Sequence, residues 1–198
     1  MKYKLFLTFG ALAAVCLSGC ASRSKYVDSD GSKTVVAAGD INIQDFAAAA
    51  DTFLASIKER MDKGTIKPAV EGEQIILAIS KIVNNTSQHI DTDQLVKKIR
   101  IELNKTGQVM TTTTLAYGEV EDPLAKETQN LRELTGQGGQ RLPDYTLTGK
   151  IIDDYTRSGR QRQASYIFQM SLTNQDGLAV WEDEKIITKQ TKSSSVGW

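Results

Sequence analysis

The clearest pattern in the chain lies in its last third. Between Gln163 and Thr173 apolar and polar residues alternate, and four apolar residues would share one face, namely Tyr166, Phe168, Met170 and Leu172. Successive side chains of a strand point to opposite faces, so this period of two predicts a strand with one buried face. The fold therefore contains a β-sheet.

Two further strand candidates flank this segment, at 145–155 and at 179–189. The separators are Arg157-Ser158-Gly159-Arg160 and Asn174-Gln175-Asp176-Gly177, which contain turn residues at hairpin spacing. Asp-Gly is the stronger of the two turn signals. The three segments are predicted to form an antiparallel meander.

Earlier in the chain, helix and strand patterns alternate. Apolar residues at helical spacing predict a helix over 43–61, with Asn42 as its N-cap and Gly64 as its stop. The segment from Gln74 to Val83 is β-branched and too continuous for a half-exposed element. It is therefore predicted to be a central strand, buried on both faces and covered by helices.

A second helix and a second strand are expected next. Asp91 or Thr92 caps a helix that runs to Lys105, and Gly107 serves as its C-cap. A strand over 109–117, which carries four consecutive threonines, follows the helix.

The last helix before the meander is predicted over 123–134. Asp122 takes its N-cap position and Pro123 its first helical position. A loop over 135–141 then leads into the meander. The predicted fold class is therefore α/β, with a mixed sheet of about four to five strands covered by helices.

The start of the chain predicts a secretory signal. Two lysines precede an apolar run from Leu5 to Leu17, and Leu17-Ser18-Gly19-Cys20 matches a bacterial lipobox. The run is shorter than the ~20 residues that a helix needs to cross a membrane, which makes a retained transmembrane anchor the weaker interpretation. We expect residues 1–19 to be removed and Cys20 to carry the lipid.

The residues after the lipobox predict a tether followed by one domain. Residues 20–40 are small and polar, so we expect a flexible tether of about 20 residues that averages ~25 Å end to end. Ala21 and the absence of acids at 22–24 favour the outer membrane as the address. Residues 41–198 are predicted to form a single globular domain. Because Cys16 lies in the removed segment, the mature chain can form no internal disulfide.

Composition argues against several functions. Loss of two signal-peptide lysines leaves 22 basic residues against 24 acidic ones. A net charge so close to zero argues against a nucleic-acid binder and against a general membrane-surface binder. The single histidine, His89, would have to supply any histidine-based metal site or serine–histidine relay alone, and its polar loop favours an exposed residue.

Several short motifs weaken when their context is considered. Ser22-Arg23-Ser24-Lys25 and Lys105-Thr106-Gly107 match two motifs of penicillin-interacting serine enzymes, but the first adjoins the lipid anchor and the second ends a helix. The loop 136–139 lacks the Lys-Ser/Thr of a phosphate loop. Neighbouring acids at 153–154 and 182–184 would face opposite sides of a strand, which disfavours a metal site. No catalytic, cofactor or metal residue is predicted.

Four residues are predicted to contact a partner. Arg157, Arg160 and Arg162 cluster at a predicted hairpin tip, where guanidinium groups can bind carboxylates of a protein or of peptidoglycan peptides. A solvated turn is the alternative. The terminal Trp198 ends a polar segment and either docks on the domain or faces a partner.

Taken together, the chain resembles the LpoB family of penicillin-binding-protein activators. The resemblance rests on the lipobox and on segments within residues 70–189. The first two are the strand 75–85, which ends at Asn-Asn-Thr, and the helix 92–104, which is followed by Gly107 and a second strand. The other two are the strand 144–149 and the hairpin that ends in Val180-Trp181. The domain also resembles the N-terminal domain of TolB.

The resemblance implies a lipoprotein on the periplasmic face of the outer membrane. Such a protein binds a bifunctional, class A penicillin-binding protein of the inner membrane and stimulates peptidoglycan synthesis, with no catalytic residue, cofactor or small-molecule substrate of its own. The best-known members have a long proline-rich linker, whereas residues 21–40 contain no proline. Two alternatives stay open: a structural lipoprotein of a secretion, efflux or flagellar assembly, and a cell-wall hydrolase that uses Asp153, Asp154 or Glu182.

Overall fold

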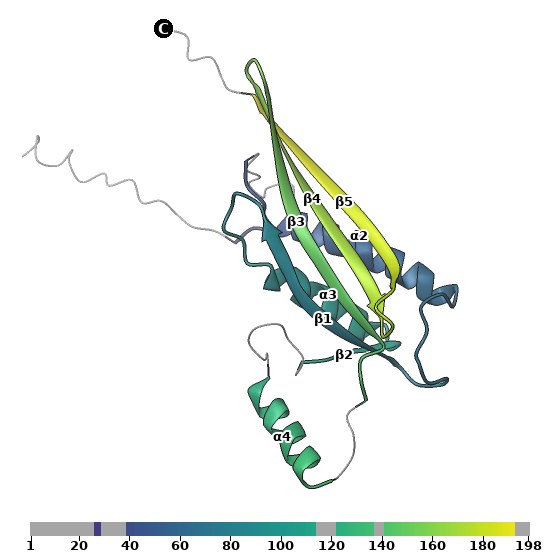
Figure 1. Ribbon diagram of the computed structural model, residues 1–198. Helices are drawn as coiled ribbons and strands as arrows, with labels where there is room; N and C mark the ends of the chain where they lie inside the picture. The colour runs from purple at the N-terminus through teal and green to yellow at the C-terminus, as the bar shows by residue number, and fades with distance from the viewer. Residues whose placement is uncertain (1–25, 29–38, 114–121, 137–140, 193–198) are drawn as a thin grey trace, which may run out of the picture. The chain divides into compact units, whose positions relative to one another are not determined.

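A single sheet of five strands forms the centre of the fold (Figure 1). The computed structural model describes residues 26–28, 39–113, 122–136 and 141–192. The strands lie in the order β2-β1-β3-β4-β5, and their bounds are β1 Ile75–Asn85, β2 Val109–Thr111, β3 Tyr145–Ser158, β4 Gln161–Asn174 and β5 Ala179–Lys192. β1 pairs in parallel with β2 and β3, whereas β3, β4 and β5 pair antiparallel. The predicted mixed sheet and meander are confirmed.

Two helices, α2 (Ile43–Asp62) and α3 (Asp93–Lys105), cover one face of this sheet (Figure 1). The side chain of Asn42 accepts hydrogen bonds from two N–H groups of the first turn of α2, and the Asp45 carboxylate accepts from the Asn42 N–H at 2.8 Å. This reciprocal capping box confirms the predicted start. Thr92 starts α3 without a side-chain cap, because its hydroxyl donates to the Ile82 carbonyl of β1 at 3.0 Å.

The core lies between these helices and the inner face of the meander. The four apolar residues predicted to share a face of β4 are at most 2% exposed. Phe46 of α2 packs edge-on against Phe168 with ring centroids 6.0 Å apart, and Phe53 packs in the same way against Trp181. Trp181 Nε1 donates to Ser56 Oγ at 2.9 Å, which satisfies the only polar atom of the buried indole.

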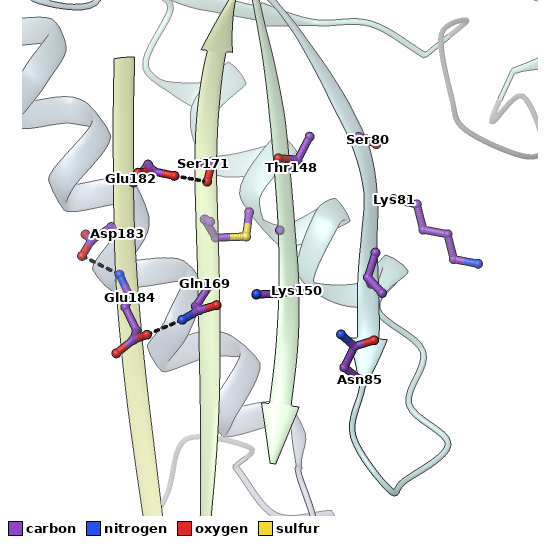
Figure 2. A pocket seen from close by; sticks show the side chains of 13 residues that line it. Ser80, Lys81, Asn85, Thr148, Lys150, Gln169, Ser171, Glu182, Asp183 and Glu184 are labelled. Carbon is purple, nitrogen blue, oxygen red and sulfur yellow. Dashed lines mark hydrogen bonds between the residues drawn. The ribbon is translucent and has the colours of Figure 1, made fainter. Parts of the chain in front are cut away.

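The prediction that helices bury both faces of β1 is wrong. α2 and α3 lie on the same side of the sheet, and within the described residues the other side is open (Figure 2). The register shifts between Ile79 and Ile82, so these residues face the core although they are three positions apart. Val83 is 50% exposed. A β-bulge therefore explains why an apolar run without alternation belongs to a strand buried mainly on one side.

The remaining early elements differ in how well they match the sequence. β2 ends at Thr111, so the strand predicted over 109–117 is shorter than expected, and residues 114–121 lie outside the described part. Helix α4 (Pro123–Leu134) has the predicted bounds, and the Asp122 carboxylate accepts from the Ala125 N–H at 3.0 Å. No residue of α4 is buried.

All three strands of the meander are longer than predicted, toward the turn between β3 and β4. The last residue of β3 that pairs with β1 is Ile152, opposite Asn85. Beyond it, β3 continues to Ser158 with β4 as its partner, and β5 continues beside β4 to Lys192. The meander therefore projects past the end of β1 and past the helices (Figure 1).

A polar network that no sequence pattern predicted holds the start of β3 beside β1. Asp144, which is 4% exposed, exchanges two hydrogen bonds of 2.8 Å with the backbone of Ile76. Arg141 donates to the same carboxylate at 2.9 Å and also to Glu73. A buried carboxylate with these partners is well compensated, and it orders the chain where the meander begins.

Candidate partner-binding surfaces

The open face of the sheet carries a groove of about 810 Å³ (Figure 2). It crosses β1, β3, β4 and β5 on the side that faces away from α2 and α3. Its charged lining residues are Lys81, Lys150, Glu182, Asp183 and Glu184. No sequence pattern predicted this surface, because the bulge in β1 hides which of its residues face outward.

Charge is divided between the two sides of the groove. Lys81 of β1 and Lys150 of β3 lie on one side, and neither makes an ion pair within the described residues. On the other side Ser171 Oγ donates to Glu182 at 3.0 Å, and Gln169 Nε2 donates to Glu184 at 2.5 Å. Both carboxylates are thus held against β4. The groove presents separate cationic and anionic sides, an arrangement suited to a ligand of mixed charge.

Nothing in this groove assembles a metal site. Within the residues that the structure describes, no group of three His, Cys, Asp or Glu side chains is placed to hold a metal ion. Glu182 and Glu184 each contact a different polar residue of β4, so their carboxylates are not directed at one point.

The basic hairpin tip, defined as residues 156–163, is the second candidate surface. It contains Arg157, Arg160 and Arg162 and no acid. The structure places Arg160 in the turn, and the register pairs Arg157 directly with Arg162. Arginines opposite each other on one face of a sheet repel, so this pairing costs stability. The prediction that these three residues contact a protein partner stays a prediction.

The chain enters the domain at residues 39–41, which are named here the strap. The side chain of Gln88 forms hydrogen bonds with this segment. Its Oε1 accepts the Ile41 N–H at 3.0 Å, and its Nε2 donates to the Gly39 carbonyl. The same Nε2 lies 3.0 Å from the hydroxyl oxygen of Tyr155 and 2.9 Å from that of Tyr166, so its two hydrogens are shared among three acceptors. One amide therefore joins the strap to β3 and β4 at the base of the hairpin tip. No local signal in the sequence pointed to this contact.

Two titratable groups beside the strap have shifted pKa values. Partial burial acts to raise the pKa of Asp153, but the hydrogen bonds that its carboxylate accepts from the Ser87 hydroxyl and N–H outweigh burial, and the pKa lies below the usual range. Burial raises the pKa of the Tyr166 phenol. The hydrogen bonds from Ser87 therefore stabilise the ionised Asp153, whereas burial favours the neutral form of Tyr166.

The other residues considered from the sequence fall into two groups. The described part of the chain does not include residues 22–25 of the first serine-enzyme motif, and it does not include Cys20 or Trp198. His89 is exposed, as expected, and residues 105–107 lie at the end of α3. Within the described residues no helix is long and apolar enough to cross a membrane.

Comparison with known structures gives matches at low identity. The C-terminal domain of LpoB from Escherichia coli is 12% identical, with a TM-score of 0.43, and the match covers 72% of this chain and 98% of that one. The corresponding domain from Salmonella enterica matches with the same identity and coverage and a TM-score of 0.42. Lipoprotein GNA1162 from Neisseria meningitidis matches over 61% of this chain and 88% of that one, at 12% identity and a TM-score of 0.39. At such scores these structures add no further argument.

Comparison of the sequence with protein families is decisive. No curated protein sequence matches the chain. The sequence model of the family described as peptidoglycan-synthase activator LpoB, however, matches residues 45–187. This range includes most of α2 and nearly all of the five-stranded sheet. The chain therefore belongs to the LpoB family of peptidoglycan-synthase activators.

Proposed function

We propose that this protein is a lipid-anchored activator that binds a class A penicillin-binding protein and stimulates its synthesis of peptidoglycan. The observation that carries the proposal is the family match over residues 45–187. The lipobox at 17–20 supports acylation of Cys20, and Ala21 after it supports the outer membrane as the address.

The proposed mechanism is binding without catalysis. An activator that binds the active conformation of a synthase more tightly than the inactive one raises the active population. The groove suits such a role, because its lysines and glutamates form a surface of mixed charge. We assign no catalytic step to Glu182 or Glu184, whose carboxylates accept hydrogen bonds from β4.

Anchoring at Cys20 limits where the synthase must present its docking site. About 20 residues separate Cys20 from the strap, and a flexible chain of this length averages ~25 Å. Fully extended it spans no more than ~70 Å. The proposal therefore requires a synthase domain that reaches to within this distance of the outer membrane.

The direct test uses the full lipidated chain in detergent and a purified class A penicillin-binding protein. We expect the chain to be retained by the immobilised synthase and to raise its rate of glycan polymerisation. The proposal would be wrong if the chain neither bound the synthase nor raised its rate of glycan polymerisation. Co-purification with a large envelope assembly, with polymerisation unchanged, would favour the structural alternative.

Paired variants identify the contact surface. Lys81→Glu combined with Lys150→Glu tests the groove, and replacement of Arg157, Arg160 and Arg162 by Gln tests the hairpin tip as the sequence predicts. Lys58→Glu with Lys63→Glu is the matched control, because Lys58 in the last turns of α2 and Lys63 at its C-cap are both exposed. The set that abolishes retention while the control binds normally carries the contact.

A further inference from the structure

The strap and the basic hairpin tip lie at the same end of the domain. Gln88 bonds the strap to Tyr155, which directly precedes the tip in β3, and to Tyr166, which lies three residues after the tip in β4. Lys189 of β5 adds a hydrogen bond of 2.7 Å from its ammonium group to the Asp40 carbonyl. The tether therefore leaves the domain at the base of the projecting meander.

Positive charge is concentrated at this end. The hairpin tip contains three arginines and no acid, whereas Lys189 farther along β5 is neutralised by its ion pair with Asp45. Lys192 lies opposite Gln161, beside the turn that holds Arg160. A net charge near zero for the whole chain therefore conceals a cationic end, where a local field can attract anions.

The Arg157–Arg162 pair indicates that an anion belongs there. The two residues are directly opposite in the register and exposed. Without an anion between or near them, these guanidinium groups repel each other, at a cost in sheet stability. Phosphate oxygens match the donors of guanidinium groups, so phosphate would convert the repulsion into binding.

The nearest source of phosphate is the headgroups of the membrane that holds the Cys20 lipid, because the tip lies close to that lipid. The tip extends about four residues past Tyr155, or roughly 13 Å at the rise of a strand. The tether averages ~25 Å. A lipid at Cys20 therefore holds the tip within a few nanometres of the membrane surface, where the effective concentration of headgroups is high.

We propose that the basic hairpin tip binds the anionic phospholipid surface of the membrane that holds the Cys20 lipid. This inference rests on the proposed lipid anchoring, but not on the identity of the synthase. Docking of the tip would turn the Asp176-Gly177 turn, at the other end of β4, away from the membrane. The groove would then stand across the middle of the domain, accessible to a periplasmic partner.

The test places a fluorophore at either end of the meander in the full lipidated protein. The mature chain has lost Cys16 and has an acylated Cys20, so Ser158→Cys introduces the one reactive thiol at the tip. Leu178→Cys, at a residue 62% exposed, labels the opposite end as the matched control. Both proteins are reconstituted into vesicles of phosphatidylcholine alone or of phosphatidylcholine mixed with phosphatidylglycerol, each with a lipid-attached quencher.

We expect quenching at position 158 in the anionic vesicles, little in the neutral ones, and none at 178. High salt should reverse it, because exposed charges are screened. Near an anionic membrane each arginine contributes about fivefold. Replacing Arg157, Arg160 and Arg162 by Gln should therefore lower the docked-to-free ratio roughly a hundredfold. Replacing Lys58, Lys63 and Lys105 by Gln removes the same charge elsewhere and should leave quenching unchanged.

Three outcomes would overturn the inference. Equal quenching in neutral and anionic vesicles would show that charge is not the cause, and an equal loss in the control variant would show that the tip is not special. Loss of synthase binding in the arginine variant, with vesicle quenching unchanged, would assign the tip to a protein partner. Co-flotation with vesicles separates the two proposals: protein that floats without quenching refutes only the docked tip, whereas protein that does not float refutes the lipid anchor as well.

Discussion

Asp45 and Lys189 form an ion pair buried between the start of α2 and the C-terminal part of β5. Their side chains are 7% and 9% exposed. Asp45 also accepts the Asn42 N–H, and the Lys189 ammonium lies 5.7 Å from the centroid of the Tyr166 ring. The pair joins residues 144 positions apart in the sequence. It therefore fastens both the strap and the first helix to the meander.

Asp45→Ala should destabilise the domain strongly. It leaves the Lys189 charge buried without its partner, which typically costs about 3–5 kcal/mol, and it removes half of the capping box. We expect the free energy of unfolding in urea to fall by about 3 kcal/mol. Asp51→Ala is the matched control on the same helix, because Asp51 is 69% exposed and 3.8 Å from Lys98. That variant should lose at most about 1 kcal/mol, and equal losses would contradict the assignment.

Gly149→Ala tests the register between β3 and β4. A Cβ at Gly149 would lie 2.7 Å from the Gln169 carbonyl oxygen and would collide with Met170 Sδ. We expect a loss of about 2 kcal/mol in thermal unfolding, as overpacking of a core usually costs. Adding Met170→Ala should not rescue it, because the backbone carbonyl stays in place and the second change opens a cavity.

The control for this substitution is Gly39→Ala, where nothing lies within 4 Å of the added Cβ. Its melting temperature should match that of the wild type. A Gly149→Ala protein that melts with the wild type would show that the register differs from the one described.

The buried phenol of Tyr166 predicts a loss of stability in alkali. Burial raises the pKa of Tyr166 in the folded state, whereas in the unfolded chain it should titrate near pH 10. The stabilising contribution is therefore complete below about pH 10 and declines above it, by up to about 1.4 kcal/mol per pH unit. Urea unfolding at a series of pH values checks the slope.

Tyr166→Phe should remove this part of the alkaline slope, because the variant has no phenol to titrate. It also loses the hydrogen bond from Gln88, so the variant should start from a lower stability at neutral pH. Tyr155→Phe, on the neighbouring strand, should reduce the slope only in part, because burial raises the pKa of Tyr166 more than the hydrogen bond to Tyr155 does. A slope changed equally by both variants would argue against a special role for burial.

Cys20→Ser should release the protein from the membrane fraction. A serine hydroxyl cannot replace the thiol that is alkylated, and two or more acyl chains are what make a lipid anchor stable. Fractionation measures the localisation of the variant. Mass spectrometry of the intact protein shows whether the variant has kept its signal peptide, as we expect. Cys16→Ser is the matched control, because that residue lies in the segment expected to be removed. Release of both variants would contradict the lipobox interpretation.

Elements set by local rules were predicted well. The capping pattern that starts at Asn42 and the alternation in β4 depend only on nearby residues, and both have the predicted form. Asp122 and Pro123 marked the start of α4 for the same reason. Backbone capping and the alternation of a strand depend on a few consecutive residues, so these residues are enough to predict where such an element begins and which face is buried.

Elements set by distant contacts were predicted less well. The apolar run of β1 was expected to be covered by helices on both faces, but a bulge after Ile79 turns part of the run toward one core. The network of Arg141, Asp144 and Glu73 had no signal at all. Each depends on a partner strand or loop whose position no local pattern specifies.

The sequence by itself determined the α/β class, the order of the elements, the hairpin with its three arginines and the resemblance to the LpoB family. Only the tertiary structure decided which face of the sheet stays open and that the strap meets the base of the hairpin tip. Those features depend on contacts between residues far apart in the chain, such as Gln88 with Ile41, 47 positions away, and Lys189 with Asp40, 149 positions away. Such contacts form only after the sheet and the two helices have packed together, because the packed core brings the distant residues within hydrogen-bonding distance.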